Sequence, residues 1–131
     1  GDWIVAHNGV LENFDELRNI HGANKHTNPV DSSIIPVVLS SMWIGNELLC
    51  IKETCEQLKG TYACWVVNKN TKNIYIVRCG STLYMNNIHS DVSSVKYTDC
   101  EQEVAEGIIY QITSEGITSV EEFKCSSPFF I

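Results

Sequence analysis

The chain begins with an apolar segment at residues 3–7, which predicts a short buried strand. The turn His7-Asn8-Gly9 follows it. Because Asn and Gly both tolerate positive φ, the Asn8-Gly9 dipeptide indicates that the chain reverses direction at this point.

Three helices are expected between residues 13 and 60, where apolar residues recur at spacings of three and four. The first helix is predicted to be capped by Asn13, with Glu16 completing a capping box, and to end near Gly22. A polar loop over residues 21–30 leads to the second helix, which opens at Asp31-Ser32-Ser33. The third begins after the cap Asn46 and is closed by Gly60. The positions expected in the core are Leu11, Phe14, Leu17, Ile20, Ile34, Ile35, Val38, Leu39, Met42, Trp43, Leu48, Ile51, Cys55 and Leu58.

From residue 61 onward the pattern changes to that of strands. The first of these strands is apolar on both faces, which is typical of a strand covered on both sides, and a polar turn over Asn68–Asn73 makes it part of a hairpin. The expected strands are Thr61–Val67, Ile74–Cys79, Thr82–Met85, Val92–Tyr97, Gly107–Thr113 and Ile117–Val120. Helices in the first half and antiparallel strands in the second predict an α+β fold, with residues 1–131 forming a single domain.

Composition and charge narrow the functional classes. Hydrophobic residues make up 44% of the 131 positions and charged residues 19%, which excludes a disordered chain. The net charge is −7 and no basic cluster occurs, so nucleic acid is not an expected partner. No apolar run reaches the length of a membrane span, so a membrane is not an expected partner either.

Six cysteines are spread irregularly along the chain: Cys50, Cys55, Cys64, Cys79, Cys100 and Cys125. This spacing suits neither a disulfide framework nor a zinc site. We interpret the cysteines as free, mostly buried thiols of a reducing compartment, and therefore expect a cytoplasmic protein. The histidines are scattered as well, so no metal site is expected; they are His7, His21, His26 and His89.

An acidic run lies between residues 99 and 106. It comprises Asp99, Glu101, Glu103 and Glu106. We interpret it as the solvated face of a loop or helix.

Four ordered sequence blocks resemble the class II glutamine amidotransferases, above all the glucosamine-6-phosphate synthase and amidophosphoribosyltransferase types. The first block, residues 4–18, reads IVAHNGVLENFDELR. The others are Asp31-Ser32-Ser33-Ile34-Ile35-Pro36, Leu58-Lys59-Gly60-Thr61-Tyr62-Ala63 and Arg78-Cys79-Gly80-Ser81-Thr82-Leu83, followed by a closing hairpin over residues 107–117.

The resemblance implies part of a four-layer αββα sandwich of the N-terminal-nucleophile type and a site that binds glutamine or glutamate. It implies an oxyanion hole made by the Asn8 side chain and the Gly9 backbone N–H, which suits a tetrahedral intermediate formed from an amide. It further implies that Asp31 holds the α-amino group of glutamine and that His7 contributes to substrate binding. No cofactor is implied.

This sequence departs from the family pattern at residue 1, which is Gly where the family has its nucleophilic Cys with the α-amino group as base. The family's upstream half, with the Arg segment that grips the substrate carboxylate, is also not in the sequence. We therefore expect glutamine hydrolysis to glutamate and ammonia only if a Cys-bearing N-terminal part completes the site. The alternatives are a catalytically inactive structural, decoration or interaction module, and a module that senses glutamine or glutamate. Each leaves an open face that an upstream segment or another protein chain is expected to cover.

Overall fold

The computed structural model describes residues 2–21, 34–86 and 91–125. The helices are α1 (Phe14–Ile20), α2 (Ile34–Ser41) and α3 (Glu47–Gln57). The strands are β1 (Trp3–Asn8), β2 (Tyr62–Asn68), β3 (Ile74–Cys79), β4 (Tyr84–Asn86), β5 (Asp91–Ser93), β6 (Gln102–Glu103), β7 (Ile108–Thr113) and β8 (Gly116–Glu122). The described part of the chain contains no helix long and apolar enough to cross a membrane.

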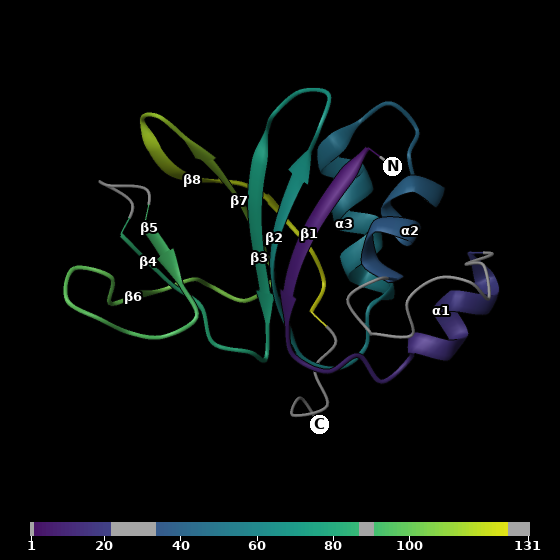
Figure 1. The fold of residues 1–131 in the computed structure, drawn as a ribbon, viewed down its shortest axis with the longest axis horizontal. Helices are drawn as coiled ribbons and strands as arrows, with labels where there is room; N and C mark the ends of the chain where they lie inside the picture. Colours follow the sequence, from purple (N-terminus) through teal and green to yellow (C-terminus); the bar gives the residue numbers. More distant parts are fainter. Residues whose placement is uncertain (1, 22–33, 87–90, 126–131) are drawn as a thin grey trace.

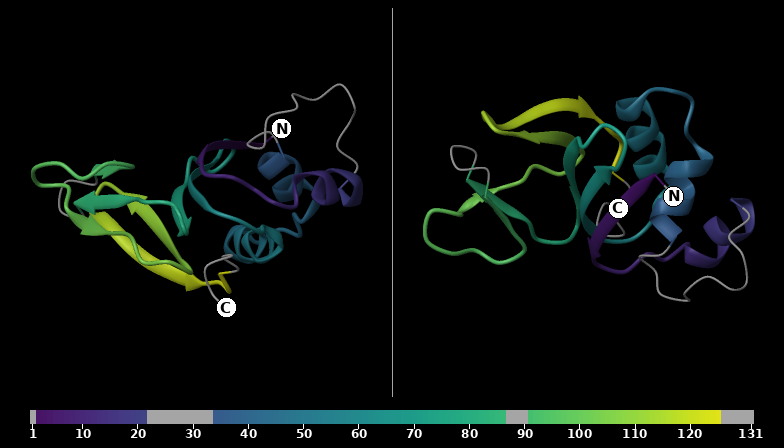
Figure 2. Two further views of the ribbon diagram at one scale, coloured as in Figure 1. Left: turned by 90° about the horizontal axis from the view of Figure 1, so that it is seen from below. Right: turned by 45° about the horizontal axis from the view of Figure 1, so that its top comes forward.

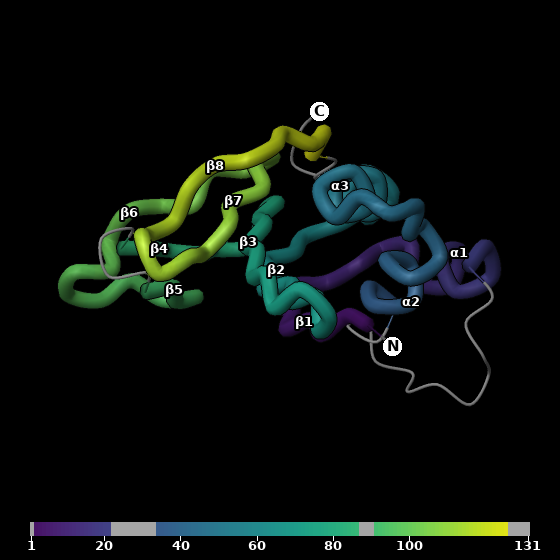
Figure 3. Tube along the Cα trace, turned by 90° about the horizontal axis from the view of Figure 1, so that it is seen from above, coloured from purple at the N-terminus to yellow at the C-terminus, as the bar shows by residue number. Residues whose placement is uncertain are grey.

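These elements form three layers (Figure 1). The middle layer is an antiparallel sheet in the order β1-β2-β3-β7-β8. The three helices lie on one side of it, and the small sheet β5-β4-β6 lies on the other, as the two further views in Figure 2 and the trace in Figure 3 also show. The expected α+β class with antiparallel sheets is confirmed.

Successive side chains of a strand point to opposite faces of the sheet, which explains why the middle sheet has a hydrophobic core on each face. In β2, Cys64 and Val66 belong to the core beneath the helices, whereas Ala63 and Trp65 face the small sheet. The antiparallel register continues each set across the sheet, so that Cys64 lies opposite Val77 of β3. The two-sided apolar pattern predicted for this strand is therefore confirmed.

The predicted cap of the first helix is wrong in its chemistry. Asn13 precedes α1, but its side chain makes no capping hydrogen bond. Instead, Asn13 Nδ2 donates to the Gln57 carbonyl at 2.7 Å, and Asn13 Oδ1 accepts from the Lys59 backbone N–H at 3.0 Å. Asn13 thus joins α1 to the connection between α3 and β2, because satisfying buried backbone groups there outweighs a local cap. The cap of α3 is confirmed, since Asn46 Oδ1 accepts from the Leu49 backbone N–H at 3.0 Å.

The ends of some predicted elements also differ from the structure. Ile20 was expected in the core but is 63% exposed, because the first helix ends there. Trp43 lies beyond the end of α2, is 44% exposed and packs edge-on against Trp3. The expected opening of the second helix at residues 31–33 lies outside the described residues.

The cysteine prediction is wrong for one pair. A disulfide joins Cys79 to Cys125, whose Cα atoms are 5.9 Å apart. The other four, Cys50, Cys55, Cys64 and Cys100, are free and buried, as predicted. The pairing partner of Cys79 lies 46 residues away in sequence and comes close only when β8 pairs with β7. A cytoplasmic location stays a prediction.

Candidate functional site

The candidate site begins where β1 ends. Asn8 is the last residue of β1, lies opposite Ala63 in the register, and has an exposed side chain. Gly9 follows with φ of +127°. A Cβ on Gly9 would lie 2.1 Å from the Thr61 backbone oxygen and 2.8 Å from Ser81 Oγ. Only glycine fits here, and its close approach sets the direction in which the Asn8-Gly9 turn leaves the sheet.

The segment after this turn is held against the chain that enters β2. The Thr61 backbone N–H donates to the Val10 carbonyl at 2.9 Å, and the Val10 N–H donates to Thr61 Oγ1 at 3.2 Å. A third bond joins the Glu12 N–H to the Lys59 carbonyl at 2.8 Å. Two segments about fifty residues apart in sequence are therefore fixed to one another directly beside Gly9, which gives the turn a rigid backing.

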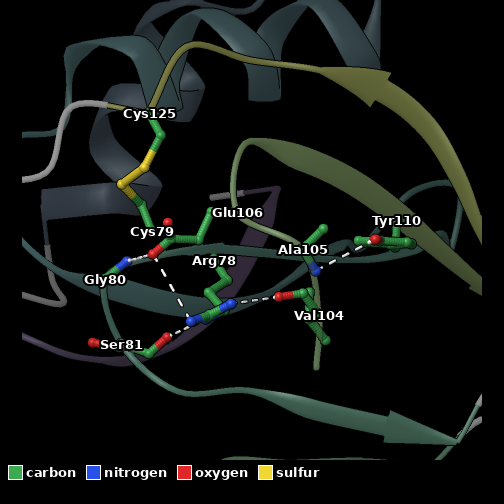
Figure 4. A network of polar contacts seen from close by, with 9 residues as sticks. All are labelled: Arg78, Cys79, Gly80, Ser81, Val104, Ala105, Glu106, Tyr110 and Cys125. Carbon is green, nitrogen blue, oxygen red and sulfur yellow. Dashed lines mark hydrogen bonds and ion pairs between the residues drawn. A yellow bond between two sulfur atoms is a disulfide. The ribbon is translucent and has the colours of Figure 1, made fainter. Parts of the chain in front are cut away.

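A second turn, Gly80-Ser81, also lies against Thr61 and is drawn in Figure 4. Gly80 has φ of +84°, and a Cβ there would lie 2.7 Å from Thr61 Cγ2. Arg78 holds the turn because its Nε donates to the Ser81 carbonyl at 2.6 Å and another guanidinium nitrogen donates to the Val104 carbonyl at 2.7 Å.

Glu106 completes this support, and sequence reasoning missed it. Its carboxylate accepts a hydrogen bond from the Gly80 N–H at 2.6 Å and lies 3.9 Å from the Arg78 guanidinium. The interpretation of Glu106 as part of a solvated face is wrong, because its carboxylate accepts a hydrogen bond from the backbone of the turn. No local pattern marks Glu106. The neighbouring Gly107 N–H bonds to the Arg78 carbonyl at 3.2 Å, so only the pairing of distant segments brings the carboxylate to the turn.

The predicted site residues are not all on one face. His7 lies opposite Cys64, and both share the helix-facing side of the sheet, whereas the neighbouring Asn8 side chain is on the opposite side. Asp31 lies outside the described residues. The structure thus brings Asn8 and Gly9 together, and the roles of His7 and Asp31 stay predictions.

Three of the four free thiols are poor candidates for a nucleophile. Burial raises the pKa of Cys50 to about 11 and that of Cys55 to about 12, and it raises the pKa of Cys64 well above its ordinary value. A thiol must ionise to attack, so these groups are unreactive near neutral pH. Cys79 is bonded to Cys125. In the described part of the chain, no three His, Cys, Asp or Glu side chains gather to hold a metal ion.

Comparison with known proteins agrees with this arrangement. No family model matches the chain. The 7-cyano-7-deazaguanine synthase of Saccharolobus solfataricus is 34% identical over 101 residues, which cover 76% of this chain and 21% of that protein. The glutamine–fructose-6-phosphate aminotransferase (isomerizing) of Clostridium perfringens is 28% identical over 130 residues, which cover 92% of this chain and 21% of that protein. The chain spans about a fifth of the length of these curated relatives.

Solved structures show the same fold. The glutamine phosphoribosylpyrophosphate amidotransferase from B. subtilis superposes with a TM-score of 0.77 over 93% of this chain and 29% of that chain, at 20% identity. The glutamine aminotransferase class-II domain protein from Silicibacter pomeroyi gives 0.71 over 94% of this chain and 69% of that chain, at 16% identity.

The fold is therefore that of the N-terminal-nucleophile type of amidotransferase. Together with the sequence matches, it makes this chain a class II glutamine amidotransferase-like domain, and the resemblance noted in the sequence is confirmed.

Proposed function

We propose that this chain supplies the oxyanion-binding and amine-binding part of a glutamine site. The observation that carries the proposal is the Asn8-Gly9 turn, whose backbone only glycine can adopt and which is backed by Thr61 and Ser81. The Asn8 amide and the Gly9 N–H would donate to the oxygen of the glutamine side chain as it becomes negative, and fixed donors cost no reorganisation at that step. Asp31 would accept from the α-ammonium group, and His7 would contribute to substrate binding.

The reaction that these groups would serve is hydrolysis of glutamine to glutamate and ammonia. A thiolate would attack the side-chain amide carbon, and collapse of the tetrahedral intermediate would release ammonia and leave a thioester. Water would then cleave the thioester to glutamate and restore the thiol. We propose that a Cys-bearing N-terminal part supplies this nucleophile, since the described thiols are buried or disulfide-bonded.

That N-terminal part, or another protein chain, would also cover an open area of the middle sheet. β1 is an edge strand, and on the side of the small sheet its Ile4 is 52% exposed. An edge strand with exposed apolar side chains is a place where further chain packs.

The alternative is an inactive module that keeps the fold for assembly or for sensing glutamine. The Asn8-Gly9 turn, with its fixed backbone, favours the enzyme over this alternative.

Reconstitution separates these possibilities. The 131-residue chain is compared with a fusion in which a Cys-led upstream segment of a class II amidotransferase precedes Gly1, and a Cys→Ala version of that segment is the matched control. Glutamine binding is followed by calorimetry and ammonia release by an enzymatic assay. We expect release above the blank only from the intact fusion. Binding without release by a folded fusion would support the sensing module, and absence of binding by every form would overturn the proposed glutamine site.

A further inference from the structure

The Cys79–Cys125 disulfide lies next to the Gly80-Ser81 turn, which packs beside Gly9. Reduction of this bond would therefore alter the support of that turn. Cys79 ends β3 and directly precedes the Gly80-Ser81 turn, while Cys125 lies three residues beyond the end of β8. The bond closes across 46 residues of sequence. Figure 4 shows the two sulfur atoms beside Gly80 and Glu106. A bond at this position couples the end of the described chain to the support of the candidate site.

Residues 123–125, here called the C-terminal strap, are also held by noncovalent contacts, since Phe123 is buried in the core beneath the helices, whereas Lys124 is exposed. The Phe123 N–H donates to the Gly107 carbonyl at 2.8 Å, and the Lys124 N–H donates to Glu56 Oε2 at 3.0 Å. The Phe123 ring also stacks on Tyr62, with centroids 6.4 Å apart. Because Tyr62 lies opposite Cys79 in the sheet register, the strap covers the strand pair from which the turn emerges. Without the disulfide, the strap is held by these two hydrogen bonds and by the packing of Phe123 and Cys125 in the core.

The two sulfur atoms differ in access. Cys79 is fully buried, whereas Cys125 is partly exposed and lines an open hollow of about 490 Å³. Glu106, Gly107 and Phe123 line the same hollow. Thiol–disulfide exchange requires a thiolate to reach one sulfur of the bond, so attack at Cys125 is favoured by access.

We propose that Cys79–Cys125 is a reversible redox site at which a dithiol reductant loosens the support of the Asn8-Gly9 turn. A reductant thiolate attacks the Cys125 sulfur and forms a mixed disulfide, and Cys79 leaves with the electron pair of the broken S–S bond and takes a proton from water. The second thiol of the reductant, as its thiolate, then attacks its own sulfur in the mixed disulfide. Cys125 leaves and is protonated, and the reductant ends as a cyclic disulfide, having passed two electrons to the cysteine pair.

The structural consequence follows from the contacts around the turn. In the oxidised state the strap is tied to Cys79, and the neighbouring Gly80 N–H bonds to Glu106. In the reduced state only hydrogen bonds and the packing of Phe123 hold the strap, so it opens more often, and Cys79 is no longer anchored from outside the sheet. Local opening therefore increases at residues 123–125 and 78–81. Because Ser81 lies against Gly9, the candidate oxyanion turn loses rigidity as well.

Hydrogen exchange with mass spectrometry tests this proposal on the full chain, with dithiothreitol as the neutral dithiol. We expect four thiols to be titrated in the denatured oxidised protein and six after reduction, since four of the six cysteines are free. Reduction of the folded protein should speed amide exchange on the order of tenfold in residues 123–125 and 78–81 and leave α2 unchanged. In the variant Cys79→Ala/Cys125→Ala, amide exchange should be as fast as in the reduced wild type and should not change when dithiothreitol is added. The control variant Cys100→Ala should respond to dithiothreitol as the wild type does.

Because reduction of the wild type needs no substitution, a poorly folded double variant does not decide the result. The proposal is overturned if six thiols titrate after treatment with oxidised dithiothreitol, if dithiothreitol fails to reduce the folded protein, or if reduction leaves exchange at both segments unchanged. None of these readouts requires glutamine to bind. If glutamine does bind, its affinity should fall on reduction, and if it does not bind in either state, only the proposed function fails.

Discussion

The carboxylate of Glu106 accepts a hydrogen bond from the backbone N–H of Gly80 at 2.6 Å, although 26 residues separate the two. This bond fixes the Gly80-Ser81 turn, in which Gly80 packs against Thr61. The backbone carbonyl of Thr61 in turn leaves no room for a side chain on Gly9. The conformation of the candidate oxyanion turn thus depends on a chain of contacts that reaches from β1 to the segment before β7.

Removal of the Glu106 carboxylate should destabilise the fold. Glu106→Ala leaves the Gly80 N–H and one side of the Arg78 guanidinium without this acceptor, and we expect the free energy of unfolding to fall by about 1–3 kcal/mol. Denaturant titration of the wild type and the variant measures this difference in the free energy of unfolding. Glu101→Ala is the matched control, because that carboxylate is exposed in the same acidic run and should change stability by less than about 0.5 kcal/mol. Equal losses in both variants would contradict the supporting role of Glu106.

The Gly9 backbone is expected to be intolerant of any side chain. Gly9→Ala places a Cβ 2.1 Å from the Thr61 carbonyl oxygen, which is backbone and cannot move aside cheaply, so we expect a loss of more than about 2 kcal/mol. Gly45→Ala is the control, since Gly45 also has positive φ (+89°) but an added Cβ meets no atom within 4 Å. That variant should lose only about 1–2 kcal/mol, the cost of left-handed backbone alone. Thermal unfolding of both variants compares them directly, and similar losses would show that the steric argument at Gly9 is wrong.

Asn8 and Asp31 should affect different steps if the proposed function holds. In the Cys-led fusion, Asn8→Ala should lower kcat for ammonia release by about 10²–10³-fold with little change in glutamine affinity, because an oxyanion donor acts on the transition state. Asp31→Ala should instead weaken glutamine binding by about 2–5 kcal/mol, since it removes the partner of the ammonium group. Steady-state kinetics and calorimetry separate the two effects. Equal losses of affinity in both variants, with kcat unchanged, would contradict these roles.

Glu47 should make the stability of the fold depend on acidic pH. Burial opposes its ionisation, but hydrogen bonds from Asn73, Thr71 and Tyr75 to the carboxylate outweigh burial and lower its pKa below the ordinary value of 4.5. The distances from these donors to the Glu47 oxygens are 2.9, 2.6 and 2.6 Å, in that order. A lowered pKa in the folded state means that this stabilisation is present above pH 4.5 and is lost as the pH falls through the lower, folded value.

The measurement is the free energy of unfolding as a function of pH in the wild type and in Glu47→Gln. We expect the wild type to lose more stability than the variant below pH 4.5, and the two curves to run parallel above it. Glu53→Gln, on the same helix α3, controls for the general effect of removing a charge. Parallel curves for wild type and Glu47→Gln throughout would contradict the assigned hydrogen bonds.

Much of the fold could be predicted from the sequence because its signals are local. The Asn46 cap, the helical spacing that follows it and the polar turn between β2 and β3 all act within a few residues. Such patterns determine a helix or a hairpin wherever the rest of the chain goes. The Asn8-Gly9 turn is of the same kind, since its two residue types tolerate a reversal that others resist.

The tertiary structure decided what distant segments do to one another. Asn13 has the residue type of a cap, yet its side chain serves the backbone at Gln57 and Lys59, because buried N–H and carbonyl groups there require partners. Cys79 has no local signal that distinguishes it from the free thiols, and only the β3-β7-β8 pairing brings Cys125 within bonding reach. The sequence alone determined the fold class, the turn at Gly9 and most of the elements, but not β6 (Gln102–Glu103) or the short extent of β5 (Asp91–Ser93). Contacts across tens of residues decided which side chains hold that turn, because strand register and not sequence spacing sets which groups meet.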